Sequence, residues 1–387
     1  MSQRTQSIVL FVLIGLVLVA GCRRREAEKD YDRQLRPGER ALREVPPSQW
    51  PTFRLSQSNR AGLQRGIELS LGWLAKPSAQ KAYEEAPVPR EAVVSALERF
   101  QELLASGIDE ASLNRRLRQE FRILQSVGWD GQGTVLFTGY YTPIFTARRT
   151  PTARFRYPLY KRPDDLVSQG LHRSVQRLPD GSTRPYPDRK ELTRSGALDG
   201  LELAYLAEPF DPYIIQVQGS AKLRLVDGGV MEIGMHGTTG HQYVPIALQL
   251  VEDGRLRPED VNLASLRQFF RDHPDLLYHY TEQNPRFVFF TEAQGGPFGS
   301  IGVPVTADVT VATDKKIFPP GALCFVDTTL GADAGARHYA GFRLDQDTGG
   351  AIQAPGRCDL YMGEGSDAER RAGQQRQEGR LYYLLAK

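Results

Sequence analysis

Three aspartates in the C-terminal third of the chain are the residues whose type and setting best fit a chemical reaction. Asp347 opens an Asp-Thr-Gly-Gly-Ala-Ile segment, Asp359 opens an Asp-Leu-Tyr-Met-Gly-Glu-Gly segment, and Asp314 follows a short apolar run. Glycine beside an acid lets a bulky ligand approach closely, and cleavage of a glycosidic bond normally uses carboxylic acids. An aspartate before Thr-Gly-Gly is also a common cap of a turn. The residues alone therefore leave a catalytic and a structural interpretation open.

The elements around these acids predict a mainly β fold with peripheral helices. Apolar spacing predicts helices over 63–74, from 89 to 107 and over 113–124, with shorter ones within 243–252 and 263–280. Strand-like runs lie at 135–143, 213–217, 221–226, 230–235, 287–290, 309–313, 323–326, 339–344 and 381–385. Asp227-Gly228 marks a hairpin, and residues 148–190 are expected to be irregular. Strand-rich ends around a strand-rich middle indicate that the middle is an insertion.

An apolar segment near the N-terminus indicates export and lipid attachment. Arg4 precedes a run from Ile8 to Val19, about a dozen residues, which is short of the roughly 20 that a membrane-spanning helix needs. The Val-Ala-Gly-Cys sequence at 19–22 is similar to a bacterial lipobox, so residues 1–21 are predicted to be a signal peptide and Cys22 the lipidated residue. The alternative is an uncleaved anchor with an incidental cysteine. Arg23, in place of an aspartate, favours the outer membrane, on its periplasmic face.

Composition and charge exclude several classes of function. The formal net charge of +3 gives no case for nucleic acid binding, and no nucleic-acid-reading motif is present. The six histidines fall at no metal-ligand spacing, so neither a metal nor another cofactor is expected.

Cys324 and Cys358 are either disulfide-bonded or free, since export permits a disulfide that sequence alone does not establish. The polar, charged residues 22–58 predict a flexible tether.

An ordered set of motifs resembles the membrane-bound lytic murein transglycosylase A family, over about residues 130–385. The set is FTGYYTP (137–143), YPLY (157–160), QVQGS (216–220), QNP (283–285), FVFF (287–290), GVPVT (302–306), DTGGAI (347–352) and DLYMGEG (359–365). The three aspartates also resemble those of the barrel domain called 3D. Each motif alone is weak, and their order carries the resemblance.

The resemblance implies two domains with a glycan groove between them. Residues 59–143 and 295–387 would form a double-psi β-barrel with N-terminal helices, and residues 144–294 an inserted β-domain. Asp359 would be the catalytic acid, supported by Asp347. The residues expected to contact the substrate are Thr138, Tyr140, Gln218, Gly219, Ser220, Asp314 and Tyr361. The expected partners are peptidoglycan glycan strands, the membrane through Cys22 and a cell-wall synthase complex, and the protein is expected to be a monomer.

The implied reaction needs only one acid. That acid protonates the oxygen leaving from N-acetylmuramic acid and then takes a proton from the same sugar's 6-hydroxyl, which attacks C1 to give a 1,6-anhydro sugar. Because the nucleophile belongs to the substrate, proximity replaces a second carboxylate and a positioned water. Such an acid needs a raised pKa, and we expect burial against Tyr361 and repulsion from Asp347 to raise that of Asp359.

Departures from the family pattern and two rival functions remain. Met235 and Met362 stand where the family often has aromatic residues, and Thr239-Gly240 stands where it often has Asn-Gly. One rival is an inverting glycoside hydrolase on the same barrel, whose product would have a reducing end. The other is a lipid-anchored module that binds peptidoglycan without cutting it, for which a buried acid would have no use.

Overall fold

A closed β-barrel of six strands holds both acidic motifs in the computed structural model, which describes residues 29–387 except 170–172 and 333–334. The strand order is β17-β14-β15-β13-β16-β3, and a β17–β3 pairing closes the ring. The strands are β3 (Val135–Thr142), β13 (Thr310–Ala312), β14 (Leu323–Leu330), β15 (Arg337–Asp347), β16 (Arg357–Glu364) and β17 (Arg376–Ala386). Their inward apolar side chains form one continuous core with the helices that pack outside.

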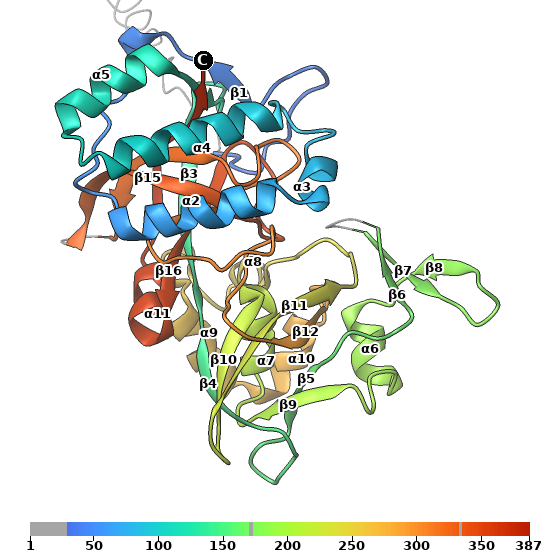
Figure 1. Ribbon diagram of the computed structural model, residues 1–387. Coiled ribbons are helices and arrows are strands. Elements are labelled where there is room, and N and C mark those ends of the chain that lie inside the picture. Colours follow the sequence, from blue (N-terminus) through green and yellow to red (C-terminus); the bar gives the residue numbers. More distant parts are fainter. Residues whose placement is uncertain (1–28, 170–172, 333–334) are drawn as a thin grey trace, which may run out of the picture. The chain divides into compact units, whose positions relative to one another are not determined.

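Helices from the N-terminal part of the chain cover the barrel, and Figure 1 shows α2 and α4 side by side across its strands. These helices are α2 (Arg60–Leu74), α3 (Pro77–Ala82), α4 (Arg90–Ala105) and α5 (Glu110–Glu120), and α11 (Gly365–Gly373) follows β16. The apolar stripes predicted for 63–74 and 93–104 are buried against the barrel, which confirms those helices. Asn59 and Asp109 cap α2 and α5 by accepting hydrogen bonds from backbone N–H groups.

The third predicted helix, over 113–124, is wrong in its last turn. The helix ends at Glu120, and β2 (Phe121–Ser126) begins at the next residue. Strand β2 pairs with the barrel strand β17, so Phe121 and Ile123 are buried by an alternating pattern and not by a helical one. Pairing with the last strand of the chain is a remote interaction, which local apolar spacing does not report.

Residues 31–58 are packed and ordered against the barrel, so the predicted flexible tether 22–58 is wrong over most of its length. Strand β1 (Leu42–Glu44) extends the barrel sheet by pairing with β2, and the 3-10 helix η1 (Pro47–Gln49) follows it. Phe53 is 1% exposed because its ring lies against those of Phe325 and Phe342, at 4.9 and 5.8 Å. Cys22 and the predicted signal peptide lie outside the described residues.

A second, six-stranded sheet is built from the chain between β3 and β13. Its order is β12-β11-β10-β4-β9-β5. The strands are β4 (Ile144–Arg148), β5 (Tyr157–Tyr160), β9 (Glu202–Leu206), β10 (Ser220–Leu225), β11 (Val230–Thr238) and β12 (Val288–Ala293). The hairpin predicted at Asp227-Gly228 joins β10 and β11, which pair antiparallel. Within the stretch expected to be irregular, a small separate sheet forms from β6 (Leu166–Ser168), β7 (Ser174–Arg177) and β8 (Thr183–Pro185).

One predicted strand in this region is a helix. Residues 213–217 belong to α7 (Asp211–Gln218), which has Pro212 in its first turn and ends at Gly219 with a φ of 77°. A short apolar run is ambiguous between strand and helix. The other helices here are α6 (Arg189–Ser195), α8 (Ile246–Glu252), α9 (Leu263–Asp272) and α10 (Leu277–Thr281), with 3-10 turns η2 (Pro258–Asp260) and η3 (Pro274–Leu276).

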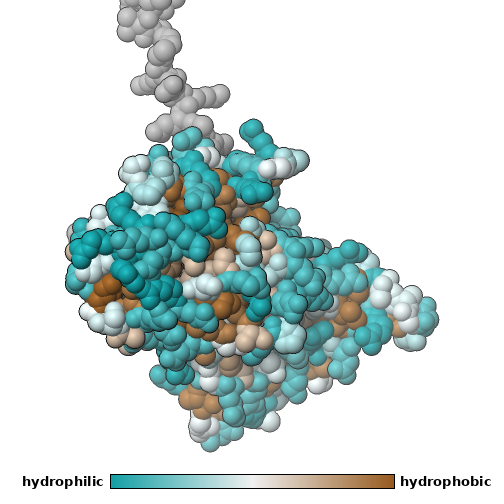
Figure 2. All heavy atoms as spheres, turned by 45° about the horizontal axis from the view of Figure 1, so that its top comes forward, coloured by the Kyte–Doolittle hydropathy of each residue, from teal (hydrophilic) through white to brown (hydrophobic). Residues whose placement is uncertain are grey.

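Cys324 and Cys358 are both buried free thiols, so the alternative of a disulfide between them is not what the structure shows. On the face shown in Figure 2 the surface is mostly hydrophilic, and apolar side chains appear there in separate patches. None of the helices in the described part of the chain is long and apolar enough to cross a membrane.

Candidate active site

Strand register brings Asp347 and Asp359 to the same level of the barrel. Asp359 on β16 pairs with Ala312 on β13, and Asp347 at the end of β15 pairs with Ala312 from the other side. The two acids therefore flank β13, with α-carbons about 10 Å apart as expected for two strand spacings. The small side chain of Ala312 leaves space between them.

The two acids open into a pocket of about 250 Å³ whose walls come from the barrel and from the second sheet with its helices. The barrel contributes β3, β13 and the 347–352 motif, while α6, α7, β11 and β12 contribute the opposite wall. The lining residues are Gly139, Tyr140, Arg189, Gln216, Val217, Gln218, Gly219, Met235, Tyr243, Asn284, Arg286, Val288, Ala312, Asp347, Thr348, Gly349, Gly350, Ala351, Ile352 and Asp359.

Asp359 has one oxygen held by the protein and one left free. Thr138 faces it on the parallel strand β3 and donates a hydrogen bond from Oγ1 to its Oδ1, whereas Oδ2 has no hydrogen-bond partner among the described residues. Burial raises the pKa of Asp359, and the charge of Arg357 and the Thr138 hydrogen bond oppose that effect. The expected repulsion from Asp347 is not part of this shift, because the sheet holds the two acids on opposite sides of β13.

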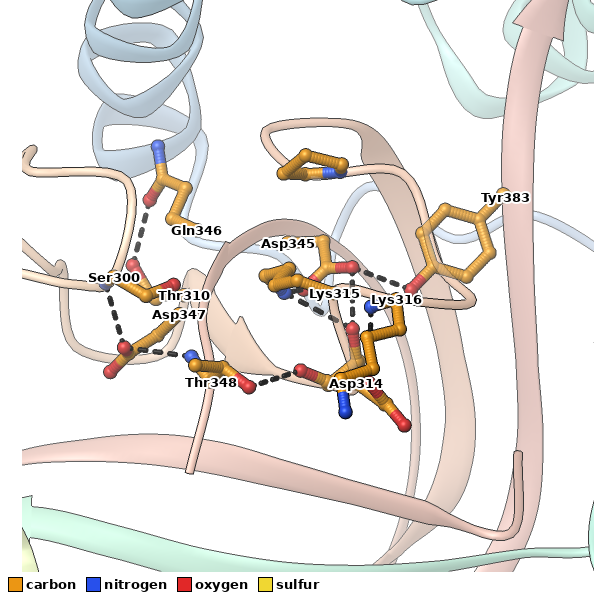
Figure 3. A network of polar contacts seen from close by, with 12 residues as sticks. Ser300, Thr310, Asp314, Lys315, Lys316, Asp345, Gln346, Asp347, Thr348 and Tyr383 are labelled. Atoms are coloured by element: carbon orange, nitrogen blue, oxygen red, sulfur yellow. Dashed lines mark hydrogen bonds and ion pairs between the residues drawn. The ribbon is translucent and has the colours of Figure 1, made fainter. Parts of the chain in front are cut away.

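Asp347 is surrounded by donors, as Figure 3 shows for its contacts with Ser300 and Thr348. The backbone N–H groups of Ser300 and Thr348 donate to Oδ1 at 2.9 and 2.8 Å, and the hydroxyl of Tyr140 donates to Oδ2 at 2.8 Å. Burial raises the pKa of this carboxyl to about 6, and the three hydrogen bonds act in the opposite direction. With both oxygens engaged, Asp347 is suited to holding its surroundings in place.

Another aspartate, Asp345, lies inside the barrel and was not among the three acids singled out from the sequence. It is fully buried, forms an ion pair with Lys315 and accepts a hydrogen bond from Tyr383 (Figure 3). The hydroxyl of Thr313 also donates to it, at 2.7 Å. Asp314, which was expected to contact the substrate, caps a turn by accepting from the backbone N–H of Lys316 at 3.0 Å. It does not line the pocket.

The other predicted substrate contacts divide into lining residues and supporting ones. Tyr140, Gln218 and Gly219 line the pocket. Tyr361 lies behind it, with its ring 5.1 Å from that of Tyr140 and its hydroxyl 2.8 Å from Thr142. Ser220 does not line the pocket, and its Oγ lies 3.5 Å from the same threonine hydroxyl. Thr138 acts on the pocket through Asp359.

Of the departures from the family pattern, only Met235 lines the pocket, and it is 44% exposed. Met362 is buried in the core, and Thr239 is buried, with its Oγ1 accepting a hydrogen bond from the backbone N–H of Phe287 at 3.0 Å. Sequence reasoning did not single out the lining residues Arg286 and Gln216, although Gln216 stood within a quoted motif. Arg189 ends an arginine-rich stretch, 148–189, for which the sequence favours a solvated surface over attraction of peptidoglycan carboxylates. Over the part of the chain that the structure describes, His, Cys, Asp and Glu side chains form no group of three that would hold a metal ion.

Comparison with known proteins gives concordant results. Residues 136–291 match the family model described as the MltA specific insert domain, and residues 309–385 match the 3D domain. Membrane-bound lytic murein transglycosylase A of Escherichia coli K12 is 33% identical over 292 residues, which cover 73% of this chain and 74% of the relative. The relative of that name from Vibrio cholerae is 33% identical over 266 residues, covering 66% and 67%.

Solved structures agree. The membrane-bound lytic murein transglycosylase of Agrobacterium tumefaciens superposes with a TM-score of 0.74 at 28% identity, covering 89% of this chain and 98% of that one. Escherichia coli MltA with bound chitohexaose superposes with a TM-score of 0.70 at 27% identity, covering 92% and 99%.

Proposed function

The chain belongs to the membrane-bound lytic murein transglycosylase A family, and from that premise we propose that it cleaves the bond between N-acetylmuramic acid and N-acetylglucosamine in peptidoglycan with Asp359 as the single acid and base. The product is a 1,6-anhydro-N-acetylmuramic acid end, which makes the enzyme a lyase and not a hydrolase. The observation that carries the role of Asp359 is its free Oδ2 in the pocket together with a pKa raised by burial.

The proposed reaction begins with the protonated form of Asp359. Burial keeps its proton available, so the free oxygen donates it to the leaving glycosidic oxygen. The resulting carboxylate accepts the proton of the 6-hydroxyl as that hydroxyl attacks C1, which restores the acid. Thr138 holds the other oxygen and fixes the orientation of the carboxyl.

Asp347 is proposed to position groups and not to activate water. Its Oδ1 accepts hydrogen bonds from the backbone N–H groups of Ser300 and Thr348, and its Oδ2 accepts one from the hydroxyl of Tyr140. These bonds connect the loop that contains Ser300, the 347–352 motif and strand β3 around the pocket. A general base in an inverting hydrolase needs an oxygen free to take a proton from water. The engagement of both Asp347 oxygens favours the lytic reaction over that rival.

The expected domain organisation is retained as part of the proposal. We assign residues 59–143 and 295–387 to a barrel domain and residues 144–294 to an inserted domain, supported by a second sheet whose strands all fall between β3 and β13. The parallel pairs β3–β16 and β13–β15 within the barrel support the double-psi type. The groove between the two parts would hold the glycan strand, and the structure of the Escherichia coli relative with bound chitohexaose supports glycan binding by this fold.

Membrane attachment is proposed through Cys22, at the periplasmic face of the outer membrane. The relatives are named as membrane-bound, and the lipobox-like sequence at 19–22 supplies a means of attachment. Several acyl chains on one cysteine hold a protein to a bilayer far better than one chain. In sequence, residues 23–30 separate that cysteine from the compact unit that begins at Tyr31.

Analysis of the products separates the proposed function from its rivals. Purified sacculi are incubated with the full chain in detergent, and the released fragments are identified by mass spectrometry. Anhydromuropeptides are expected. Reducing ends without an anhydro sugar would point to the inverting hydrolase, and binding without release of fragments would point to the non-catalytic module.

A further inference from the structure

Two buried arginines in the pocket wall have no acidic partner among the described residues. Arg189, at the start of α6, is 5% exposed, and Arg286, just before β12, is 8% exposed. Both line the pocket that contains Asp347 and Asp359. Neither guanidinium forms an ion pair with a carboxylate of the described residues. By contrast, the less buried Arg267 is paired with Asp211 at 2.7 Å.

Most of the hydrogen-bonding capacity of these two groups is unused by the protein. Arg189 donates from Nε to the carbonyl of Asn284 at 3.0 Å and from Nη2 to the carbonyl of Arg286, and Arg286 donates to the carbonyl of His241 at 3.4 Å. A guanidinium carries five N–H donors. The two groups thus use three of their ten donors within the described structure.

The wall fixes the Arg189 guanidinium without neutralising it. The aromatic rings of Tyr213 and Phe287 lie 4.9 and 5.0 Å from it, so it is held in place by cation–π contacts. Burial lowers the pKa of Arg189 to about 10 and also lowers that of Arg286. A buried charge is unfavourable unless it is paired, and an anionic ligand would provide that pairing.

A neighbouring amide is also unsatisfied. Gln216 on α7 is 7% exposed, lines the same pocket, and has no hydrogen-bond partner for Oε1 among the described residues. Arg189 and Gln216 also line a second cavity of about 450 Å³, whose walls include Tyr157, Tyr160 and other aromatic side chains. The two cavities therefore share two wall residues, the cation Arg189 and the amide acceptor Gln216.

We propose that Arg189 and Arg286 bind a carboxylate of the peptidoglycan strand, while Gln216 accepts a hydrogen bond from an amide N–H beside it. This inference rests on the proposed function, since peptidoglycan supplies carboxylates that chitin-like glycans lack. The carboxylate belongs either to the stem peptide or, where that peptide has been removed, to the lactyl group of muramic acid. An amide N–H next to a carboxylate is what a stem peptide presents, and the second cavity has room for a short peptide.

Binding to three uncut ligands tests the proposal. These are the disaccharide N-acetylglucosaminyl-N-acetylmuramic acid with its stem peptide, the same disaccharide with a free lactyl carboxylate, and chitohexaose, which has no carboxylate. Neither disaccharide contains the bond that the enzyme cuts. Affinities are measured by calorimetry with the full chain in detergent. Arg286→Gln is expected to weaken binding of the peptide-bearing disaccharide by about tenfold or more, the size typical of a charged hydrogen bond.

Two further variants separate the charge from the packing. Arg286→Lys keeps the charge and is expected to recover most of the lost affinity. Arg224→Gln makes the same charge change on an exposed residue of β10 that lines neither cavity, and no loss is expected. Circular dichroism and thermal unfolding check that each variant is folded. If Arg286→Gln does not fold, Arg189→Gln is compared with wild type on the same three ligands, and a loss confined to the carboxylate-bearing ligands is expected.

The pattern across ligands decides the outcome. A loss on the peptide-bearing disaccharide alone supports the site and assigns the stem peptide as the source. A loss on the free-lactyl disaccharide alone supports the site and assigns the lactyl group. A loss on both supports a site that accepts either carboxylate, because the lactyl carboxyl of the peptide-bearing disaccharide is bound in an amide. An equal loss on chitohexaose, or no loss on either disaccharide, overturns the proposal. Failure of the proposed function is separate, because it would appear as absence of anhydromuropeptides from sacculi treated with wild-type enzyme.

Discussion

Asp347→Asn is expected to change how the stability of the protein depends on pH. Burial raises the pKa of Asp347 from 3.8 to about 6. Between those values the folded protein keeps a proton that the unfolded chain has released, so the free energy of unfolding falls as pH rises. This contribution is complete below about pH 4 and is lost above about pH 6. The gap corresponds to about 3 kcal/mol, a large share of the 5–15 kcal/mol that typically separates folded from unfolded domains.

Asparagine fits the site without ionising. Its carbonyl oxygen accepts from the backbone N–H groups of Ser300 and Thr348, and its amide donates to the Tyr140 hydroxyl. The free energy of unfolding is measured by urea denaturation at several pH values from 4 to 7.5. The variant is expected to gain up to about 3 kcal/mol relative to wild type across that range.

The control is Asp164→Asn, which changes an exposed aspartate in the same way and should show no such trend. A difference between Asp347→Asn and wild type that stays constant from pH 4 to 7.5 would refute the argument, because it would mean that Asp347 is not held protonated by burial.

Two further predictions rest on single contacts, and a third rests on the lipobox-like sequence. Tyr140→Phe removes a hydrogen bond that favours ionised Asp347. The fall in the free energy of unfolding with pH should therefore extend about one to two pH units higher in the same urea series. An unchanged midpoint of that fall would contradict this. Gly139→Ala places a Cβ 2.8 Å from the α-carbon of Ala372, and thermal unfolding should report a loss of about 1–3 kcal/mol, whereas unchanged stability would mean that α11 moves freely. Cys22→Ala should abolish lipid labelling, and labelling that persists on another residue would make the lipobox interpretation wrong.

Elements whose signals are local were predictable from the sequence, and elements fixed by remote pairing were not. The helices over 63–74 and 93–104 follow from apolar spacing, and the hairpin at 227–228 follows from its turn residues. The apolar residues at the start of β2 also fit the last turn of a helix, which is why a helix was predicted there. They form a strand because β17, at the far end of the chain, pairs with them. The tether was misjudged for the same reason, since Phe53 has its partners at Phe325 and Phe342.

The site residues also fall into those with a local sequence signal and those whose position depends on remote contacts. The two acids were found because their glycine-rich motifs are distinctive, and Thr138 and Tyr140 because they lie in a motif on the strand that pairs with β16. Arg189 was not assigned to the pocket, because it stands at the end of an arginine-rich stretch, 148–189, in which most arginines are exposed. Its burial depends on Tyr213 and Phe287, which only the fold brings to it.

The rate of anhydromuropeptide release by Asp359→Asn tests the central claim most directly. This change keeps the shape of the side chain and removes its proton, and general acid catalysis is typically worth about 10²–10⁴-fold. Release from purified sacculi is therefore expected to fall by at least about 100-fold, while chitohexaose is still bound and circular dichroism shows a folded protein. Asp347→Asn should reduce the rate less, because that acid positions its neighbours. Release by Asp359→Asn at a rate near that of wild type would contradict the account, and inactivity of Asp347→Asn alone would exchange the two roles.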